Sequence, residues 1–230
     1  MNDESVRVTS LARCPLFRNV PREVLAGVAR QMRGRHFSRN EVIFHQGDPG
    51  EALYVITEGS VKILLPSAEG EEAIIATLRP GDFFGELALL DRAPRSATAK
   101  ALEPTQTWEL PRDMFRRILD ADNSLRDALL TALSGELRRL TGHVEELHFL
   151  DLAGRLALRL VRLASDASSG ESAVRLDWPY TQSDLAAMIG GTRQSVNRLL
   201  NVLEADGLVR IERDVLIITD INRLAARAER

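Results

Sequence analysis

Residues 81–98 read GDFFGELALLDRAPRSAT, and this stretch carries the most informative motif of the chain. Gly85 lets the backbone approach a ligand closely, and it precedes a short predicted helix from Glu86 to Leu90 whose free N–H groups favour an anion. Arg95 offers a guanidinium fork for phosphate oxygens, and Ser96 offers a hydroxyl group. The Glu86 carboxylate suits sugar hydroxyls better than phosphate. The stretch therefore predicts a phosphate-binding pocket.

The flanking segments have the pattern of a small antiparallel roll. Short alternating or β-branched runs are separated by turn residues, as at 47–50 and 79–82, and this spacing is typical of a small barrel or roll. The predicted strands are Glu41–Phe44, Leu53–Thr57, Ser60–Leu65, Ala73–Leu78, Ser96–Leu102 and Thr105–Leu110. Helices are predicted over 7–14 and 21–32 before the strands, and over Pro111–Leu119 after them.

A long helix is predicted over Ser124–His148, and six of its apolar residues recur at spacings of three and four. Such a heptad stripe is narrower than the face by which a helix usually packs on its own domain, so it predicts a homodimer. Packing of the stripe on its own domain is the alternative. The predicted dimer seam consists of Leu130, Leu133, Leu137, Leu140, Val144 and Leu147. The register fails at Asp151, so a hinge is expected over Phe149–Asp151.

The C-terminal third has the pattern of a winged helix-turn-helix. After a predicted helix over Leu152–Ala164 and a loop over Ser165–Glu171, the segment Thr181–Leu203 holds two helical stretches separated by a glycine pair. Thr181 or Ser183 is expected to cap the first and Thr192 the second. The second helix carries no acidic residue before Glu204, whereas a generic solvated helix face would mix acids with bases. A two-stranded wing is predicted over Gly207–Ile218, and the residues predicted to contact DNA are Thr192, Arg193, Gln194, Asn197 and Arg198.

From about residue 10 to 220 these motifs resemble the cyclic-AMP receptor protein/fumarate-nitrate regulator (CRP/FNR) family of bacterial transcription regulators. The resemblance implies an α+β fold with three parts. These are a jelly-roll-like cyclic-nucleotide-binding β-roll over 1–122, a long dimerisation helix and hinge over 123–150, and a winged helix-turn-helix DNA-binding domain over 151–230. It implies cyclic AMP or a related cyclic nucleotide as allosteric effector, double-stranded DNA with a two-fold operator as partner, and contact with RNA polymerase.

The resemblance also implies roles for individual residues and shows two departures. The expected effector-binding residues are Gly85, Glu86, Leu87, Arg95, Ser96 and Thr141. Cyclic-AMP sensors of the family carry two adjacent hydroxyl residues on the long helix, whereas this chain has Leu140 before Thr141. The effector therefore stays open between cyclic AMP, another nucleotide such as a cyclic dinucleotide, and none. Gln194 stands where family members carry Glu, which predicts an operator altered at one base pair because Gln pairs best with adenine.

Composition excludes several other classes of protein. No apolar run is long enough to span a bilayer and the N-terminus lacks the features of a signal peptide, so a cytoplasmic protein is expected. One cysteine, Cys14, which we expect to be half-buried, and four histidines without ligand spacing predict no metal, haem or iron–sulfur site. The sequence shows no pairing of a nucleophile with a general base, so an enzyme is not expected. A nucleotide-binding module of a kinase or channel, which needs no DNA reader, would have no use for residues 181–218.

Overall fold

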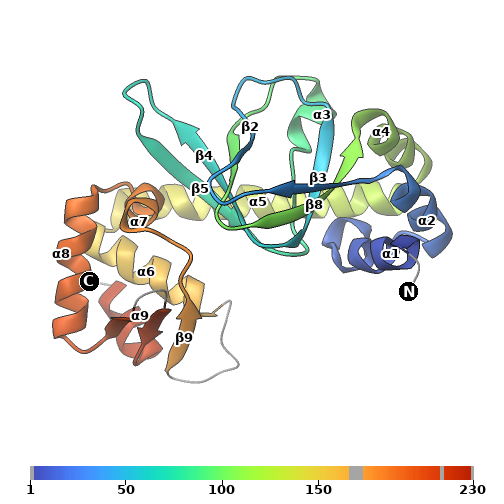
Figure 1. The fold of residues 1–230 in the computed structure, drawn as a ribbon. Coiled ribbons are helices and arrows are strands. Elements are labelled where there is room, and N and C mark those ends of the chain that lie inside the picture. Colours follow the sequence, from blue (N-terminus) through green and yellow to red (C-terminus); the bar gives the residue numbers. More distant parts are fainter. Residues whose placement is uncertain (1–2, 166–172, 213–214, 229–230) are drawn as a thin grey trace. The chain divides into compact units, whose positions relative to one another are not determined.

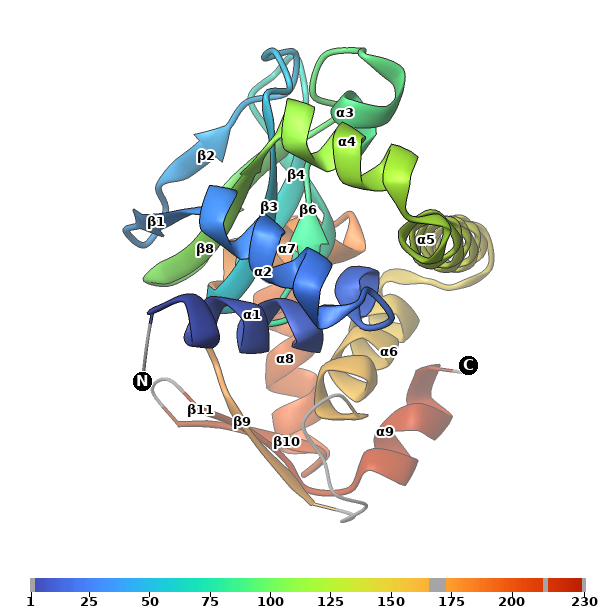
Figure 2. The ribbon, with the colours of Figure 1, turned by 90° about the vertical axis from the view of Figure 1, so that its right-hand side faces the viewer.

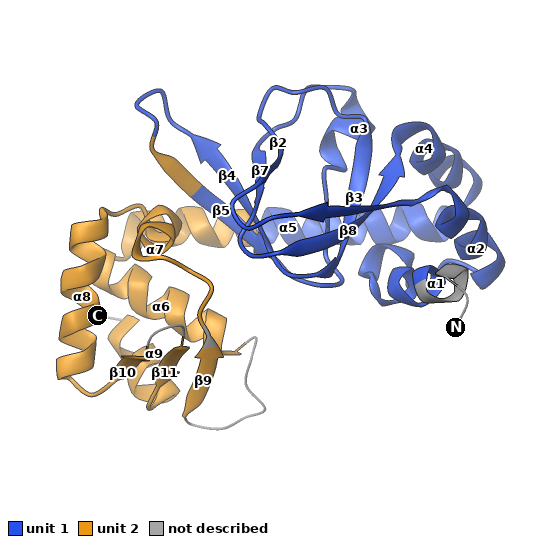
Figure 3. Cartoon of the chain, viewed as in Figure 1, with its two compact units in different colours: residues 1–70, 74–138 blue, residues 71–73, 139–230 orange. Residues whose placement is uncertain are grey.

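The computed structural model describes residues 3–165, 173–212 and 215–228 (Figure 1). The chain divides into two compact units, and the division falls within the long helix α5 (Asn123–Phe149). Residues 1–70 and 74–138 form unit 1, and residues 71–73 and 139–230 form unit 2 (Figure 3). The three-part domain division expected from the sequence stays a prediction.

Unit 1 begins with helices that build one end of its core. These are α1 (Asp3–Arg13), the 3-10 helix η1 (Pro15–Phe17) and α2 (Arg22–Gln31), which begins directly after Pro21. Helices α1 and α2 pack against each other (Figure 2). Cys14 is fully buried at their junction, not half-buried as expected, because η1 turns it into the apolar core. Burial raises the pKa of the Cys14 thiol to about 12.

Two four-stranded sheets form the roll. Their orders are β1-β8-β3-β6 and β2-β7-β4-β5. The strands are β1 (Arg33–Phe37), β2 (Val42–Phe44), β3 (Ala52–Glu58), β4 (Val61–Pro66), β5 (Glu72–Leu78), β6 (Phe83–Phe84), β7 (Thr98–Ala101) and β8 (Thr105–Pro111). The predicted roll is confirmed, with β1 and β6 as two strands that the sequence did not predict.

Three helices interrupt or follow the roll. The short helix α3 (Leu87–Asp91) lies between β6 and β7, and α4 (Arg112–Ala121) follows β8. The predicted long helix is α5, whose first turns bury Leu125 and Leu129 in unit 1. Along the predicted seam, Leu133 packs partly against this core. By contrast, the other five seam residues, Leu130, Leu137, Leu140, Val144 and Leu147, are exposed.

Unit 2 carries the predicted helix-turn-helix. Its elements are α6 (Leu152–Ser165), β9 (Val174–Asp177), α7 (Gln182–Ile189), α8 (Arg193–Ala205), β10 (Val209–Glu212), β11 (Val215–Ile218) and α9 (Ile221–Ala228). The chain leaves the helical conformation at Leu150 and Asp151, where the hinge was predicted. Helix α9 packs along α6 (Figure 2) and buries Leu224.

Two expectations for unit 2 need correction. The wing has three strands in the order β10-β11-β9, because β9 pairs antiparallel with β11 from before the helix-turn-helix. Ser165, predicted as the first residue of a loop over Ser165–Glu171, is the last residue of α6, and its hydroxyl donates to the carbonyl of Val161. The rest of that predicted loop lies outside the described residues.

Candidate functional site

The side chain of Arg95 is the centre of the site in unit 1. It is only 5% exposed, although an arginine is rarely buried unless it is paired. Its Nη1 donates to the carbonyl oxygen of Gly85 at 2.6 Å and its Nη2 to that of Ala52 at 2.8 Å. The buried Nε has no hydrogen-bond partner among the residues that the structure describes. The roll therefore holds the Arg95 guanidinium in its interior with one N–H donor, that of Nε, not hydrogen-bonded to the described residues.

Aromatic rings from three strands surround this guanidinium. Its carbon lies 4.1 Å from the ring centre of Phe44 and 6.0 Å from that of Tyr54. Phe84 joins the group, stacked on Tyr54 with ring centres 5.2 Å apart. A cation over an aromatic face is attracted by the ring quadrupole, and the attraction strengthens where water is excluded. Burial lowers the pKa of Arg95, although arginine stays charged throughout the physiological range.

Gly85 is at the one position of the site that admits no side chain. Its φ of +86° lies in the left-handed region that favours glycine. A Cβ there would meet Arg95 Nη1 at 2.6 Å and the carbonyl oxygen of Ala52 at 3.2 Å. The sequence predicted that Gly85 lets the backbone approach a ligand, and this stays a prediction. The structure shows that Gly85 leaves room for the Arg95 side chain.

Glu86 follows at the start of α3. The side chain is half-buried, and burial is the main cause that raises the pKa of its carboxyl. Glu136 on α5 raises this pKa further, whereas Arg95 lowers it. A carboxyl group with partly lost hydration and a cation nearby is suited to accept hydrogen bonds from neutral hydroxyls.

The other predicted effector residues are less enclosed. Leu87 is 43% exposed and Ser96 is exposed. Thr141 is exposed on the part of α5 that belongs to unit 2, so the structure does not place it relative to the other five. The structure thus brings Gly85, Glu86 and Arg95 together with Leu87 and Ser96 beside them, and their contacts with an effector stay predictions.

A loop between β2 and β3 completes the frame. The Arg95 backbone N–H donates to the carbonyl of Asp48 at 2.9 Å, and the Gly47 N–H donates to the carbonyl of Arg95 at 2.9 Å. Reasoning from the sequence missed this role for the loop and missed Phe44, Tyr54 and Ala52 as neighbours of Arg95. Their own residue types carry no signal for it, because the contacts span more than one strand of the roll.

Unit 2 presents the second candidate site on α8. Thr192 caps this helix by accepting from the Ser195 N–H at 3.1 Å, and Thr181 forms a capping box with Asp184 at the start of α7. Gly190, with a φ of +67°, ends α7. One face of α8 buries apolar residues, while Thr192 and the predicted reading residues Arg193, Gln194, Asn197 and Arg198 are all exposed.

Neither a metal cluster nor a membrane-spanning helix is found among the described residues. No group of three or more histidine, cysteine, aspartate or glutamate side chains is placed to hold a metal ion within residues 3–165, 173–212 and 215–228. Within the same residues, no helix combines the length and the apolar character needed to cross a membrane.

Two family models match the chain on either side of the helix break. A cyclic nucleotide-binding domain matches residues 34–122, and a Crp-like helix-turn-helix domain matches residues 154–227. A CRP-like cAMP-activated global transcriptional regulator of Mycobacterium tuberculosis is 32% identical over 219 residues, which cover 95% of this chain and 98% of the relative. The chain belongs to the CRP/FNR family of transcription regulators. The predicted family and fold class are confirmed.

Further members support the same assignment. The cyclic AMP receptor protein of Thermus thermophilus is 30% identical and covers 86% of this chain, with 88% of its own length matched. The crystal structure of another CRP/FNR-family transcriptional regulator from Thermus thermophilus has a TM-score of 0.71 at 28% identity, and covers 86% of this chain and 99% of that one. This CRP/FNR protein is therefore a DNA-binding transcription regulator with a cyclic nucleotide-binding domain, not an enzyme. The Crp-like match argues against a nucleotide-binding module without DNA binding.

Proposed function

We propose that this regulator is a homodimer whose sequence-specific binding to a two-fold symmetric operator is controlled by cyclic AMP held in the roll. The observation that carries the proposal is the buried Arg95 guanidinium, with its unpartnered Nε, next to a glycine whose place no other residue fits. The names of the Mycobacterium tuberculosis and Thermus thermophilus relatives, which specify cyclic AMP, support the choice of nucleotide.

In unit 1, the chemistry of each side chain suggests its role. Arg95 and Ser96 would hold the cyclic phosphate, because a guanidinium fork and a hydroxyl both donate to phosphate oxygens. The backbone at Gly85 and Leu87 would complete the cradle, and Glu86 would accept from the ribose hydroxyl. Thr141 would hydrogen-bond the purine. Two of these groups, Arg95 and Gly85, already fit each other closely.

In unit 2, the exposed side chains of α8 would read the operator. Arg193, Gln194 and Arg198 would contact base edges, and Thr192 and Asn197 would contact the backbone or bases. A dimer places two such helices in successive major grooves, about 34–36 Å apart, which accounts for a two-fold operator. Contact with RNA polymerase is proposed from membership of the family.

The seam on α5 would join the two protomers. Leu130 and Leu137 are 62% and 67% exposed in the single chain, and Val144 is 55% exposed. A row of large apolar side chains on one helix face is stabilised by burial against a second copy of the same row. The break at Leu150 and Asp151 would allow the effector to change how the DNA-binding parts are presented, as a shift between two states of the dimer.

The test is calorimetric titration of the full-length protein with cyclic AMP, cyclic GMP and cyclic di-GMP, repeated with Arg95→Ala and with the exposed control Arg22→Ala. We expect cyclic AMP to bind to the wild-type protein and the control. Arg95→Ala should lose both cyclic AMP binding and the cyclic AMP-dependent gain in operator affinity, while sedimentation still shows a dimer. Titrations unchanged by Arg95→Ala would show that the pocket is assigned to the wrong residues.

A second candidate function keeps the fold and changes the effector. Leu140 has no hydrogen-bonding group for a purine, and losing one such bond costs on the order of 1 kcal/mol, which is several-fold in affinity. This departure favours a regulator tuned to another nucleotide, such as a cyclic dinucleotide, or one that needs none. In the titrations above, binding of cyclic di-GMP without cyclic AMP would support the first version, and operator binding that ignores all three nucleotides would support the second.

A further inference from the structure

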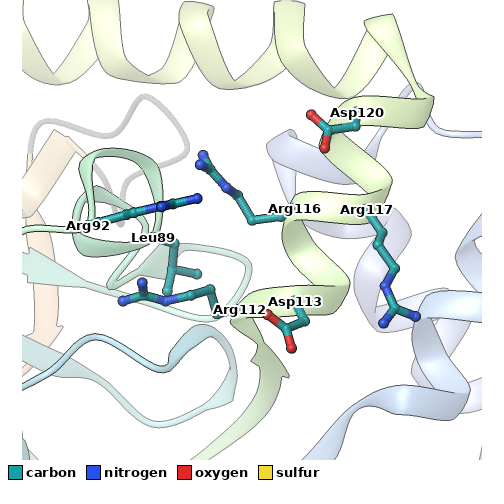
Figure 4. Close-up of a pocket in the computed structure, with 7 residues that line it drawn as sticks. All are labelled: Leu89, Arg92, Arg112, Asp113, Arg116, Arg117 and Asp120. Atoms are coloured by element: carbon teal, nitrogen blue, oxygen red, sulfur yellow. The ribbon is translucent and has the colours of Figure 1, made fainter.

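A depression of about 690 Å³ lies between α3 and α4, and Arg95 is not among the residues that line it. Four arginines, two aspartates and one leucine line it: Arg92, Arg112, Arg116, Arg117, Asp113, Asp120 and Leu89 (Figure 4). Its volume is in the range of small-molecule sites, which is about 300–1,000 Å³. Unlike most such sites it is lined mainly by charged groups, with more cations than anions.

Two of the arginines converge on one place. Figure 4 shows the Arg92 and Arg116 side chains reaching toward each other from the end of α3 and from α4, while Arg117 points away from this pair. Two like charges repel each other, and an anion between them would turn the repulsion into attraction. The two aspartates of the lining lie on α4 and are exposed.

The fold holds part of this group in place. Arg116 Nη1 donates to the carbonyl of Leu90 at 3.2 Å. Arg112 donates through Nε to the carbonyl of Gly50 at 2.8 Å and through Nη2 to that of Ala88 at 3.4 Å. Capping the α3 carbonyls of Ala88 and Leu90 accounts for two of these contacts, and the bond to Gly50 ties α4 to the loop before β3. These contacts leave Arg116 Nε and Nη2 available, so capping does not account for the whole cluster.

Arg92 is the residue that capping leaves unexplained. It ends α3 in the left-handed conformation with a φ of +64°, where glycine or asparagine would cost less. Its side chain makes no hydrogen bond or ion pair with the residues described by the structure. The chain therefore places an arginine at a position that suits arginine poorly, and directs it toward a second arginine.

We propose that this depression is a second anion site, which binds the phosphate groups of a small molecule. Guanidinium groups match phosphate oxygens in geometry and charge, and two of them reaching in from different elements can hold adjacent phosphates. The source of the phosphates is either a nucleoside polyphosphate or inorganic pyrophosphate, and both present the same group. The proposal does not depend on cyclic AMP being the effector at Arg95.

The test is calorimetric titration of the full-length protein with inorganic pyrophosphate and, separately, with ATP. We expect both to bind at the depression, and binding of ATP alone would assign the phosphates to a nucleoside. The double variant Arg92→Asn/Arg116→Gln should weaken binding by roughly ten- to a hundredfold, because it removes charge-assisted hydrogen bonds. Asparagine tolerates the backbone at 92, and glutamine keeps a neutral, polar side chain at 116. The exposed control Arg22→Gln should bind as the wild type does.

Three results would overturn the proposal. They are failure of both anions to bind, an unchanged affinity in the double variant, and binding of a glutamate-rich peptide without either phosphate compound. The last would instead make the depression a docking surface for an acidic protein segment. Circular dichroism melts check that the double variant folds, and Arg92→Asn alone, which breaks no hydrogen bond of the described fold, repeats the test if it does not. Cyclic AMP titration of the same variants reports separately on the function proposed above.

Discussion

Gly85 and Arg95 constrain each other, because the guanidinium lies where a side chain at residue 85 would have to go. Any replacement of this glycine should lower the stability of the fold for two reasons. One is the left-handed backbone, and the other is the displacement of a cation that bonds to Gly85 and Ala52. The chain offers a control in Gly70, whose φ is +83° and whose Cβ would meet nothing within 4 Å.

We predict that Gly85→Ala lowers the free energy of unfolding by more than Gly70→Ala does. Both variants carry the backbone cost of about 1–2 kcal/mol, and only the first displaces Arg95. Urea unfolding of the two variants measures the difference. Equal losses would mean that Arg95 moves aside without cost and would contradict this account.

Glu86 gives the site a dependence on pH. Since burial raises the pKa of its carboxyl above the ordinary value of 4.5, the folded protein binds a proton here more readily than the unfolded chain does. Stability from this group is therefore greatest below the ordinary value and falls as the pH rises through the raised pKa. Above the raised pKa the carboxylate is charged in both the folded and the unfolded chain, so this group lowers the free energy of unfolding by a constant amount.

We predict that Glu86→Gln increases the free energy of unfolding at pH 8, and that its advantage shrinks as the pH is lowered toward 4.5. The neutral amide carries no charge to desolvate. Urea unfolding across this range measures the trend, with the same substitution at the exposed Glu69 as a control. A Glu86→Gln variant that is less stable than wild type at pH 8 would contradict this account.

At the scale of elements, periodicity located most of the fold. Alternating or helical apolar patterns predicted most of the roll strands, helices α4 and α5, and the helix-turn-helix pair α7 and α8. Strand β1 was missed because RGRHF has no such alternation, with four exposed residues before a buried Phe37. Strand β6 is two residues long, and β9 joins the wing through pairing with β11 that local sequence does not signal. The motif found Glu86 and Arg95, but their aromatic neighbours come from other strands.

Helix α8 carries a prediction about sequence recognition. Gln194 is exposed near its N-terminus, where the capped first turn holds the side chain toward solvent. We predict that Gln194→Glu moves operator preference toward C·G at one position of each half-site by roughly 1–3 kcal/mol, because a carboxylate accepts from cytosine N4. Binding to a randomised operator library measures the shift. Gln194→Ala should lose the preference there without gaining C·G, and a profile unchanged by Gln194→Glu would contradict the assignment.

At the scale of the whole molecule, the exposed leucines of α5 carry the proposed assembly. Leu137 is 67% exposed and Arg138 beside it is also exposed, yet only Leu137 is in the heptad seam. We predict that Leu137→Glu converts a dimer into a monomer, because a buried carboxylate opposite its own copy is strongly unfavourable. Sedimentation measures the change. Arg138→Glu introduces the same side chain off the seam and should leave the dimer intact, so loss of the dimer in both variants would point to another interface.

The burial of Cys14 has a practical consequence for work on this regulator. The chain has one cysteine, and its thiol is fully buried with a pKa of about 12, so very little reactive thiolate is present near neutral pH. A second cysteine placed at exposed Asn201 on α8 would then be labelled selectively by a maleimide dye, without first removing Cys14. Fluorescence from that dye could follow the reading helix as it meets an operator.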